Sequence, residues 1–431
     1  MSRAKRRIAA WFALGAATTA LAGFGGWIAS LPKGEMAHPV PIPATEQTAI
    51  LEALASNGRK RPVIAVIGLN DATETTDYLM PTGILRRADV ADVVLVAARE
   101  GPLKLYPALT VMPDAPIDAF DAAHPDGADY VIVPAMSRDD DPVILAWLQS
   151  QADKGAIIIG VCAGAKVVAA AGLLQDRRAT THWYYLPELL RRHPSITAVP
   201  DRRYVIDHNV ATTTGVSASM PMALTLIEAI AGRPKANQVA AEIGLSHWDA
   251  SHDSSAFGIT RPFAMTVLGN LLSFWRREQL ELELPAEFDA VSLALTADAW
   301  SRTYRSRAFT RATSGAPVAD RDGIRVVPDR VATEASSYTV TSPGLTPPAH
   351  ALDQALRAIR TRYGPRTASV VAMQLEYASD TTAWGASAGG DGRRTLSVPR
   401  RALPSTSTMA AGRCPSRAER PYCEKDALSR L

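Results

Sequence analysis

The sequence has few cysteines and no strong excess of charge of either sign. Three cysteines among 431 residues exclude a disulfide-based scaffold and a zinc site made of cysteines alone, which needs four. The 46 Lys and Arg residues nearly balance the 43 Asp and Glu residues, and the net charge of +3 is too small to indicate nucleic-acid binding by itself. With 47% hydrophobic residues, the chain has the composition of a folded protein of two or three domains.

A long uncharged run lies near the N-terminus. Residues 1–7 are basic, and residues 8–31 then contain no charged side chain over 24 positions. About 20 apolar residues suffice for a helix to span a bilayer, so the run predicts a transmembrane anchor after a cytoplasmic N-terminus. A cleaved signal peptide is the alternative, because Ala20 and Ala22 have the spacing of a cleavage site. Both predict a globular part outside the cytoplasm, on the periplasmic or extracellular side.

The middle of the chain alternates between short apolar runs and helical stretches. Runs rich in Val and Ile occur at 63–67, 93–97, 130–133 and 156–160, and such runs suit strands that are buried on both faces. Strands that alternate with helices predict a parallel sheet flanked by helices, in a three-layer α/β sandwich. We expect a linker and a leading helix at 32–61, and the α/β domain at 62–245.

Cys162 lies in a turn that suits a nucleophile. It follows the predicted strand at 156–160, precedes a helical stretch at 165–174, and stands in the segment Gly-Val-Cys-Ala-Gly-Ala. Small residues allow a sharp strand-to-helix turn, the geometry of a nucleophile elbow. A sulfur at a helix N-terminus is expected to ionise easily, and the amides of Ala163 and Gly164 are expected to face an oxyanion. A buried cysteine that only fills space is the alternative.

These residues resemble the DJ-1/PfpI family of the class I glutamine-amidotransferase-like superfamily. The elbow around Cys162 matches, as does Ala-Thr-Thr-His-Trp at 179–183, a form most similar to the amidase-like domain of AraC-type regulators. Asp77, four residues before Pro81, matches the position of the family's acid; isocyanide hydratase-like members have Asp there. The resemblance implies a flavodoxin-like sandwich and a site of Cys162, His182 and Asp77. It also implies a possible homodimer.

The resemblance suggests a role for each of these side chains. Cys162 would attack the substrate or be modified, Asp77 would share a proton with the sulfur, and His182 would act as a general base or stabilise the thiolate. Glu74, one helical turn before Asp77, is a weaker candidate for the acid. The family usually has Gly-Gly after the strand at 130–133, where this chain has Ala135 and Met136, and one oxyanion amide commonly comes from this turn.

The second half predicts an irregular α+β extension at 246–378. Residues 223–245 and 355–377 align without a gap and share seven residues, which suggests a repeated helix–Gly–helix unit; two Ala-rich helices that look alike are the alternative. Residues 320–323 read Asp-Arg-Asp-Gly, a hairpin-type turn. Residues 379–431, with Cys414 and Cys423, lack periodicity and predict a disordered tail.

The leading prediction of function is a membrane-anchored, cysteine-dependent hydrolase, hydratase or lyase that acts on a small C–N or carbonyl substrate. The alternatives are a non-enzymatic redox or ligand sensor and the amidase-like domain of a transcriptional regulator. Proline residues interrupt helical runs in the extension, so we expect no nucleic-acid partner. His247 and His252 are five residues apart, which places them on different faces of a helix, so we expect no metal and no cofactor.

Overall fold

The computed structural model describes residues 3–34, 38–55, 59–331, 339–340 and 347–377. The tail predicted at 379–431, with Cys414 and Cys423, lies outside these ranges. The described residues from the N-terminus to Tyr377 fall in one compact unit. The α/β domain and its extension therefore have to be considered together.

The N-terminal uncharged run forms helix α1 (Arg3–Ser30), and α2 (Ala44–Ala53) follows it. The membrane-spanning helix that the sequence predicts over residues 8–31 is not borne out. No helix among the described residues is both long enough and apolar enough to cross a bilayer.

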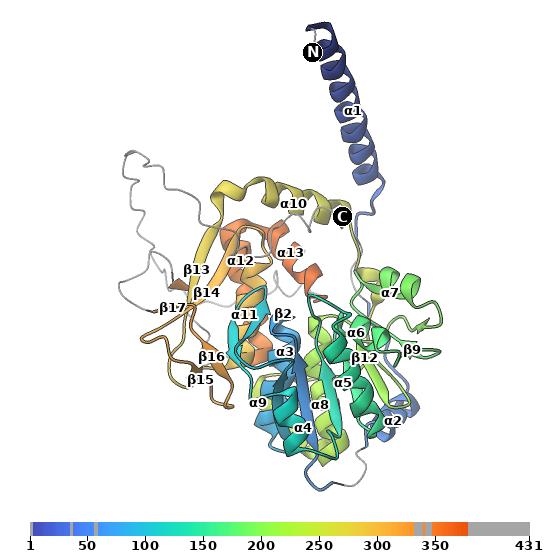
Figure 1. Cartoon of the computed structure of the whole chain (residues 1–431), viewed down its shortest axis with the longest axis vertical. Coiled ribbons are helices and arrows are strands. Elements are labelled where there is room, and N and C mark those ends of the chain that lie inside the picture. Colours follow the sequence, from blue (N-terminus) through green and yellow to red (C-terminus); the bar gives the residue numbers. More distant parts are fainter. Residues whose placement is uncertain (1–2, 35–37, 56–58, 332–338, 341–346, 378–431) are drawn as a thin grey trace, which may run out of the picture. The chain divides into compact units, whose positions relative to one another are not determined.

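The centre of the fold is a seven-stranded sheet in the order β11-β12-β8-β7-β1-β3-β6 (Figure 1). Its strands are β1 (Val63–Gly68), β3 (Asp92–Ala97), β6 (Ala115–Pro116), β7 (Tyr130–Val133), β8 (Ile157–Gly160), β11 (Tyr204–Asp207) and β12 (Val210–Thr213). All neighbours pair in parallel except β11 and β12. The four predicted apolar runs become β1, β3, β7 and β8, which confirms the parallel α/β sheet.

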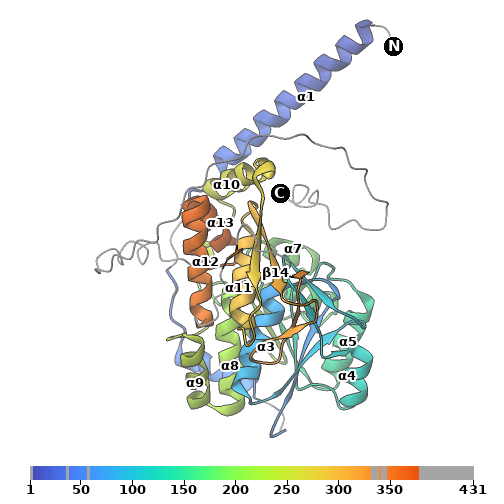
Figure 2. The same cartoon turned by 90° about the vertical axis from the view of Figure 1, so that its left-hand side faces the viewer.

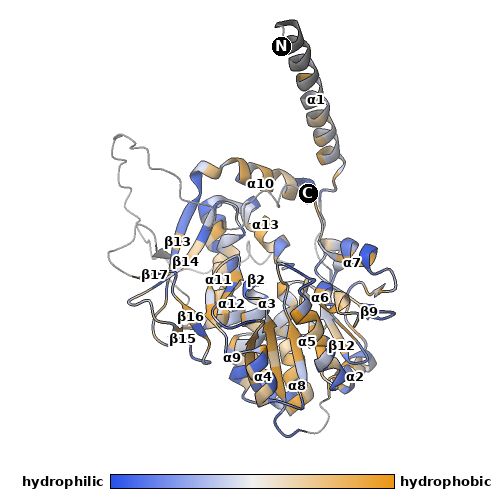
Figure 3. Ribbon diagram, viewed as in Figure 1, coloured by the Kyte–Doolittle hydropathy of each residue, from blue (hydrophilic) through white to orange (hydrophobic). Residues whose placement is uncertain are grey.

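Helices cover both faces of this sheet and complete the three layers (Figure 2). They are α3 (Thr75–Ala88), α4 (Ile117–Ala123), α5 (Pro142–Asp153), α6 (Gly164–Ala170), α7 (Leu186–Arg192), α8 (Ser219–Ala231) and α9 (Arg233–Ile243). Phe120 of α4 and Trp147 of α5 join the core on one face, whereas Pro81 of α3 and Met222 of α8 line a small internal space on the other. The apolar colouring of the central strands and of α8 shows this core (Figure 3).

The extension adds helices and two further sheets. After α10 (Arg261–Leu272) come β13 (Glu278–Glu283), α11 (Ala290–Ser301), β14 (Ser306–Ala312), β15 (Val318–Ala319), β16 (Arg325–Val327), β17 (Arg330–Val331), β18 (Thr339–Val340), α12 (Pro348–Tyr363) and α13 (Pro365–Gln374). A parallel sheet has the order β17-β14-β13-β18. The predicted hairpin turn at 320–323 joins β15 to β16, which confirms a β element there.

A second sheet is shared between the α/β domain and the extension. Its order is β15-β16-β5-β4-β2, where β2 (Asp71–Glu74), β4 (Leu103–Tyr106) and β5 (Thr110–Met112) come from the domain. Strands β5 and β16 pair antiparallel across the boundary. The extension is therefore hydrogen-bonded into the domain.

The predicted repeat also appears in the backbone. Helices α8 and α9 flank Gly232 (φ 83°, ψ 164°), and α12 and α13 flank Gly364 (φ 91°, ψ 165°). A left-handed φ of this size favours glycine, which explains why both turns carry it. Both segments are helix–Gly–helix units with the same turn.

Candidate active site

Cys162 stands on a strained turn between β8 and α6. Its φ of 56° lies in the left-handed region, which is uncommon for a residue with a side chain. The backbone N–H of Cys162 donates to Thr213 Oγ1 (3.1 Å), and its carbonyl accepts from Thr181 Oγ1 (2.8 Å). These bonds, from the neighbouring strand β12 and from the segment after β9 (Arg178–Ala179), hold the unusual conformation.

The thiol of Cys162 is buried, with only 6% of the residue exposed. Burial raises its pKa well above the ordinary value, and the nearby carboxylates of Asp77 and Glu74 raise it further; the N–H of Ala163 acts in the opposite direction. The expectation of an easily ionised sulfur is therefore wrong for this arrangement. Helix α6, which follows the turn, has only seven residues. Its dipole favours the thiolate, but it does not outweigh desolvation and the nearby acidic groups of Asp77 and Glu74, which favour the thiol.

Asp77 lies in the first turn of α3 and is completely buried. Its Oδ2 accepts a hydrogen bond from the N–H of Ala135 (3.2 Å), whereas Oδ1 has no partner among the described residues. Burial and the charge of Glu74 raise the pKa of Asp77 well above its ordinary value. These effects favour the protonated form of the Asp77 carboxyl, close to a thiol whose protonated form burial also favours.

Glu74 has a structural position instead of the proposed acid role. Its carboxylate caps α3 by accepting from the N–H of Asp77 (2.6 Å), and it also accepts from Thr76 Oγ1 (2.9 Å). Its Oε1 accepts from the guanidinium of Arg302 (2.7 Å). With these bonds formed, the second candidate for the acid is fully engaged as a helix cap and an ion-pair partner.

His182 has a partner at both ring nitrogens. Nδ1 accepts from the N–H of Tyr184 (3.2 Å), so Nε2 carries the proton and donates to the carbonyl of Gln374 (3.0 Å). Burial lowers the pKa of His182, which keeps the ring neutral. The structure therefore brings His182 to the same end of the sheet without freeing a nitrogen to act as a base for Cys162.

Two of the three amides expected to bind an oxyanion are occupied. The N–H of Gly164 donates to the carbonyl of Val161 (2.8 Å), and the N–H of Ala135 donates to Asp77. These expectations are wrong for this arrangement because the turn and the buried acid use the donors. The N–H of Ala163 remains, and its hydrogen bond to the Cys162 sulfur stabilises negative charge there.

Sequence reasoning missed side chains that the fold brings to this site. Arg302 follows α11, and its Nε donates to the buried Asp298 (2.6 Å) while its terminal nitrogen binds Glu74. Burial raises the pKa of Tyr185 to about 12, and the charge of an ionised Cys162 would raise it further. Tyr185 lies three residues after His182 and could have been considered, but no local signal marks Arg302.

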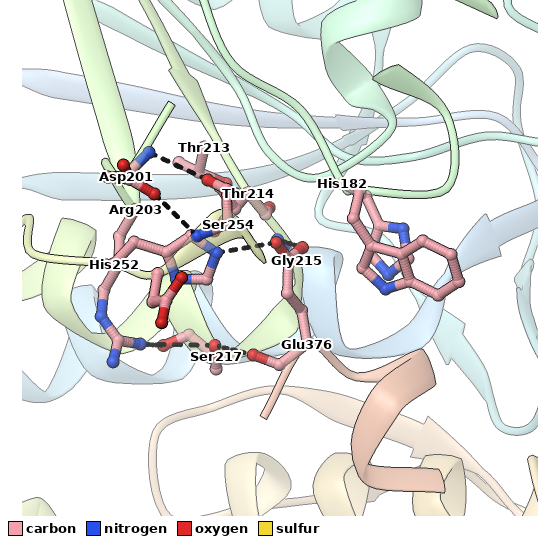
Figure 4. A network of polar contacts seen from close by, with 12 residues as sticks. His182, Asp201, Arg203, Thr213, Thr214, Gly215, Ser217, His252, Ser254 and Glu376 are labelled. Carbon is pink, nitrogen blue, oxygen red and sulfur yellow. Dashed lines mark hydrogen bonds and ion pairs between the residues drawn. The ribbon is translucent and has the colours of Figure 1, made fainter. Parts of the chain in front are cut away.

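A buried network joins the extension to the elbow side of the sheet (Figure 4). Glu376, 2% exposed, follows α13; its Oε2 accepts from the N–H of Gly215 (2.6 Å), and its Oε1 bonds His252 Nε2 (3.0 Å). Trp183 Nε1 donates to the carbonyl of Met373 (2.9 Å). The last turn of α13 thus contacts His182 and Trp183, and Glu376 beyond it contacts Gly215 and His252.

The two histidines that were considered as metal ligands have different surroundings. His252 is buried and bonds Glu376, whereas His247 is exposed and contacts Asp249 (3.2 Å). No group of three or more His, Cys, Asp or Glu side chains that could hold a metal ion occurs among the described residues. The fold and site together define an α/β protein with a buried thiol on a strand-to-helix elbow.

Comparison with known proteins gives the family. The model of the DJ-1/PfpI family matches residues 63–229, so this part of the chain belongs to that family. Isonitrile hydratase of Pseudomonas putida is 42% identical over 94 residues, which are 22% of this chain and 40% of that protein. The regulator CdhR of Pseudomonas aeruginosa is 28% identical over 136 residues, which cover 40% of its length. The match thus spans less than half of both relatives.

Other relatives match over nearly their whole length. The Parkinson disease protein 7 homolog of Danio rerio is 26% identical over 186 residues, which are 42% of this chain and 95% of that protein. The crystal structure of DJ-1beta from Drosophila melanogaster has a TM-score of 0.40 and 22% identity, and it covers 43% of this chain. These matches leave more than half of the chain without a counterpart.

Proposed function

We propose that this chain is a cysteine-dependent hydratase of small isonitriles, with Cys162 as nucleophile and Asp77 as proton donor. The observation that carries the proposal is the buried carboxyl of Asp77, which has one oxygen without a partner among the described residues and which acts electrostatically on the thiol. The similarity to isonitrile hydratase supports the substrate class. The membership of residues 63–229 in the DJ-1/PfpI family is consistent with a reactive cysteine at this position.

A protonated acid beside a thiol suits addition to an isonitrile, R–N≡C. Asp77 donates its proton to the terminal carbon, the sulfur of Cys162 bonds to that carbon, and the thiol proton passes to Asp77. The product is a thioimidate, R–N=CH–S–Cys162. Water then adds to the same carbon, a proton moves to nitrogen, and the C–S bond breaks. The formamide R–NH–CHO leaves and the thiol is restored, so the net reaction adds one water.

The test is formation of formamide from a small alkyl isonitrile by the full chain, followed by NMR. We expect Cys162→Ser and Asp77→Asn to lower kcat/KM by about 100-fold or more, the range typical for loss of a nucleophile or a general acid. Asp141→Asn is the matched control, because Asp141 is a buried helix cap of α5 at a distance from the thiol. Absence of formamide with the wild-type chain would reject the proposal, as would undiminished turnover by Cys162→Ser.

A redox sensor is the second candidate, and one observation favours it. Both nitrogens of His182 are engaged, and the thiol is almost completely buried, so the described arrangement is closed. A sensor would react slowly with hydrogen peroxide: the sulfur of Cys162 attacks one oxygen, the O–O bond breaks, and sulfenic acid and water form. Stoichiometric sulfenic acid at Cys162 without formamide production would favour the sensor.

A further inference from the structure

The backbone of residues 63–116 recurs at residues 278–331, at a constant spacing of 215 residues (63 to 278 and 110 to 325). The matching pairs are β1 and β13, α3 and α11, β3 and β14, β4 and β15, β5 and β16, and β6 and β17. Strand β13 pairs in parallel with β14 as β1 does with β3, and β14 pairs in parallel with β17 as β3 does with β6. The extension therefore repeats the order and the pairing of the first elements of the domain.

Local details recur at the same spacing. The left-handed residues Ala72 (φ 59°) and Asp89 (φ 51°) correspond to Glu287 (φ 60°) and Tyr304 (φ 59°). A hydrogen bond from a strand N–H to an aspartate side chain in the following loop also recurs. Leu95 N–H donates to Asp114 Oδ2 at 2.8 Å, and Thr310 N–H donates to Asp329 Oδ2 at the same distance. Since such details do not follow from having similar elements, they identify a second copy of this part of the fold.

The helix–Gly–helix units belong to the same duplication. Leu245 N–H donates to the carbonyl of Ala240 (2.8 Å), and 132 residues later Tyr377 N–H donates to that of Ala372 (2.8 Å). The turn residue before each donor is left-handed: Gly244 has φ 79° and Glu376 has φ 52°. The second copy thus comprises residues 278–331 and 347–377, and residues 117–214, which include the elbow, have no full counterpart among the described residues.

The two copies are related by a pseudo-two-fold axis. In the antiparallel pair of β5 and β16, Val111 faces the equivalent Val326, while Thr110 faces Val327 and Met112 faces Arg325. This register is unchanged when the copies are exchanged, as in the interface of a symmetric dimer. The axis therefore passes by the Val111–Val326 pair.

The helices beside this axis make reciprocal ion pairs. Arg302, after α11, binds Glu74, the cap of α3. The equivalent Arg87, at the end of α3, binds Asp289, the cap of α11 (2.7 Å). Each arginine stands 13 positions after the cap of its own helix (74 to 87 and 289 to 302).

We propose that residues 278–331 and 347–377 are a shortened internal copy of the fold that takes the place of a partner subunit. This copy occupies the face of α3 and β5 that a second molecule would need for a two-fold contact, so the chain is a monomer. It also completes the Cys162 site in cis, through Arg302 on Glu74 and through the end of α13, where Gln374 bonds His182. The proposal rests on the proposed function only for the choice of Cys162 as the reactive group.

Arg302 and Glu376, the residues that the second copy brings to the site, differ in their contacts or backbone cost from the equivalent residues of the first copy, Arg87 and Gly244. Arg87 binds Asp289 and Asp322 in a copy whose described residues include no elbow, whereas Arg302 binds Glu74, the acid near Asp77. Glu376 takes the left-handed position that Gly244 fills in the first copy, at a steric cost that glycine avoids. Its bonds to Gly215 and His252 offset that cost.

The experiment compares Arg302→Met with the symmetry-related control Arg87→Met in the full chain. Light scattering should give a mass near 46.0 kDa for the wild type, the mass of one chain. Alkylation of Cys162 by iodoacetamide is followed across pH by the mass of its peptide, which separates it from Cys414 and Cys423. Loss of the Arg302 charge leaves Glu74 uncompensated, so we expect alkylation at pH 8, relative to its own plateau at high pH, to slow about threefold or more.

Arg302→Lys should restore the wild-type pH profile, and Arg87→Met should leave the profile unchanged while lowering stability to a similar degree. A stable dimer of the full chain would overturn the proposal. Equal shifts in Arg302→Met and Arg87→Met would also overturn it, because the effect would then be general loosening, and so would no shift in either. Alkylation needs no isonitrile, so a chain that passes this test without making formamide loses only the proposed hydratase activity.

Discussion

Replacing Gly164 with alanine should destabilise the elbow, and the loss of folding free energy can be estimated from the structure. A Cβ at this position would lie 1.9 Å from the carbonyl oxygen of Val133 and 2.9 Å from the carbonyl carbon of Pro134. Since real Cβ contacts do not fall below 3.0 Å, the neighbouring backbone must retreat by 1.1 Å, the difference between 3.0 and 1.9. The oxygen of Val133 accepts from the N–H of Val161 (2.9 Å), so this bond between β7 and the elbow is weakened.

Overpacking of this kind costs about 1–3 kcal/mol, and the weakened hydrogen bond adds about 1 kcal/mol. The smaller unfolded-state entropy of alanine returns about 0.4–1 kcal/mol, so we expect a net loss of about 1–4 kcal/mol. Urea denaturation of Gly164→Ala measures this loss. Gly258→Ala is the matched control, because a Cβ there meets nothing within 4 Å. Equal midpoints for the two variants would show that the tight contact of the elbow with β7 does not exist.

Three further predictions follow from the titratable groups. Glu74→Gln removes a negative neighbour of the thiol, so alkylation of Cys162 at pH 8 should become severalfold faster, as measured by peptide mass; an unchanged rate would mean that this carboxylate does not act on the sulfur. The pKa of His182 is lowered in the folded state, so acidification below about pH 6.5 should cost the wild type more stability than His182→Gln in urea titrations; parallel curves would contradict this. Burial raises the pKa of Asp320 to about 6, so the stabilisation that it gives in its protonated form is lost as pH rises through 6, and Asp320→Asn should flatten that part of the stability curve; an unaltered curve would exclude the effect.

The parallel sheet was predictable because its signal is local. Strands buried on both faces need continuous apolar residues, and the runs at 63–67 and 156–160 show them. The elbow was predictable for the same reason, since Gly160 and Gly164 stand close to Cys162 in the sequence. The protonation state of the thiol was not, because burial and the carboxylate of Glu74 act through space and depend on the packing of α3.

The second copy largely escaped sequence reasoning for a different reason. Over residues 63–116 and 278–331, seven of 54 positions are identical, among them Arg87/Arg302 and Asp114/Asp329. Backbone geometry tolerates such divergence, because buried positions need only apolar groups of suitable volume. Contacts between distant segments, such as Arg302 with Glu74 or Gln374 with His182, carry no local pattern that a single sequence could show.

The internal duplication has a consequence for how this molecule can change. In a symmetric pair of identical chains every substitution appears twice, so a change that helps one half must be tolerated by the other. Here each half has its own codons, and position 376 holds a glutamate where position 244 holds a glycine. One half has thereby been free to give up its own nucleophile and to serve the chemistry of the other.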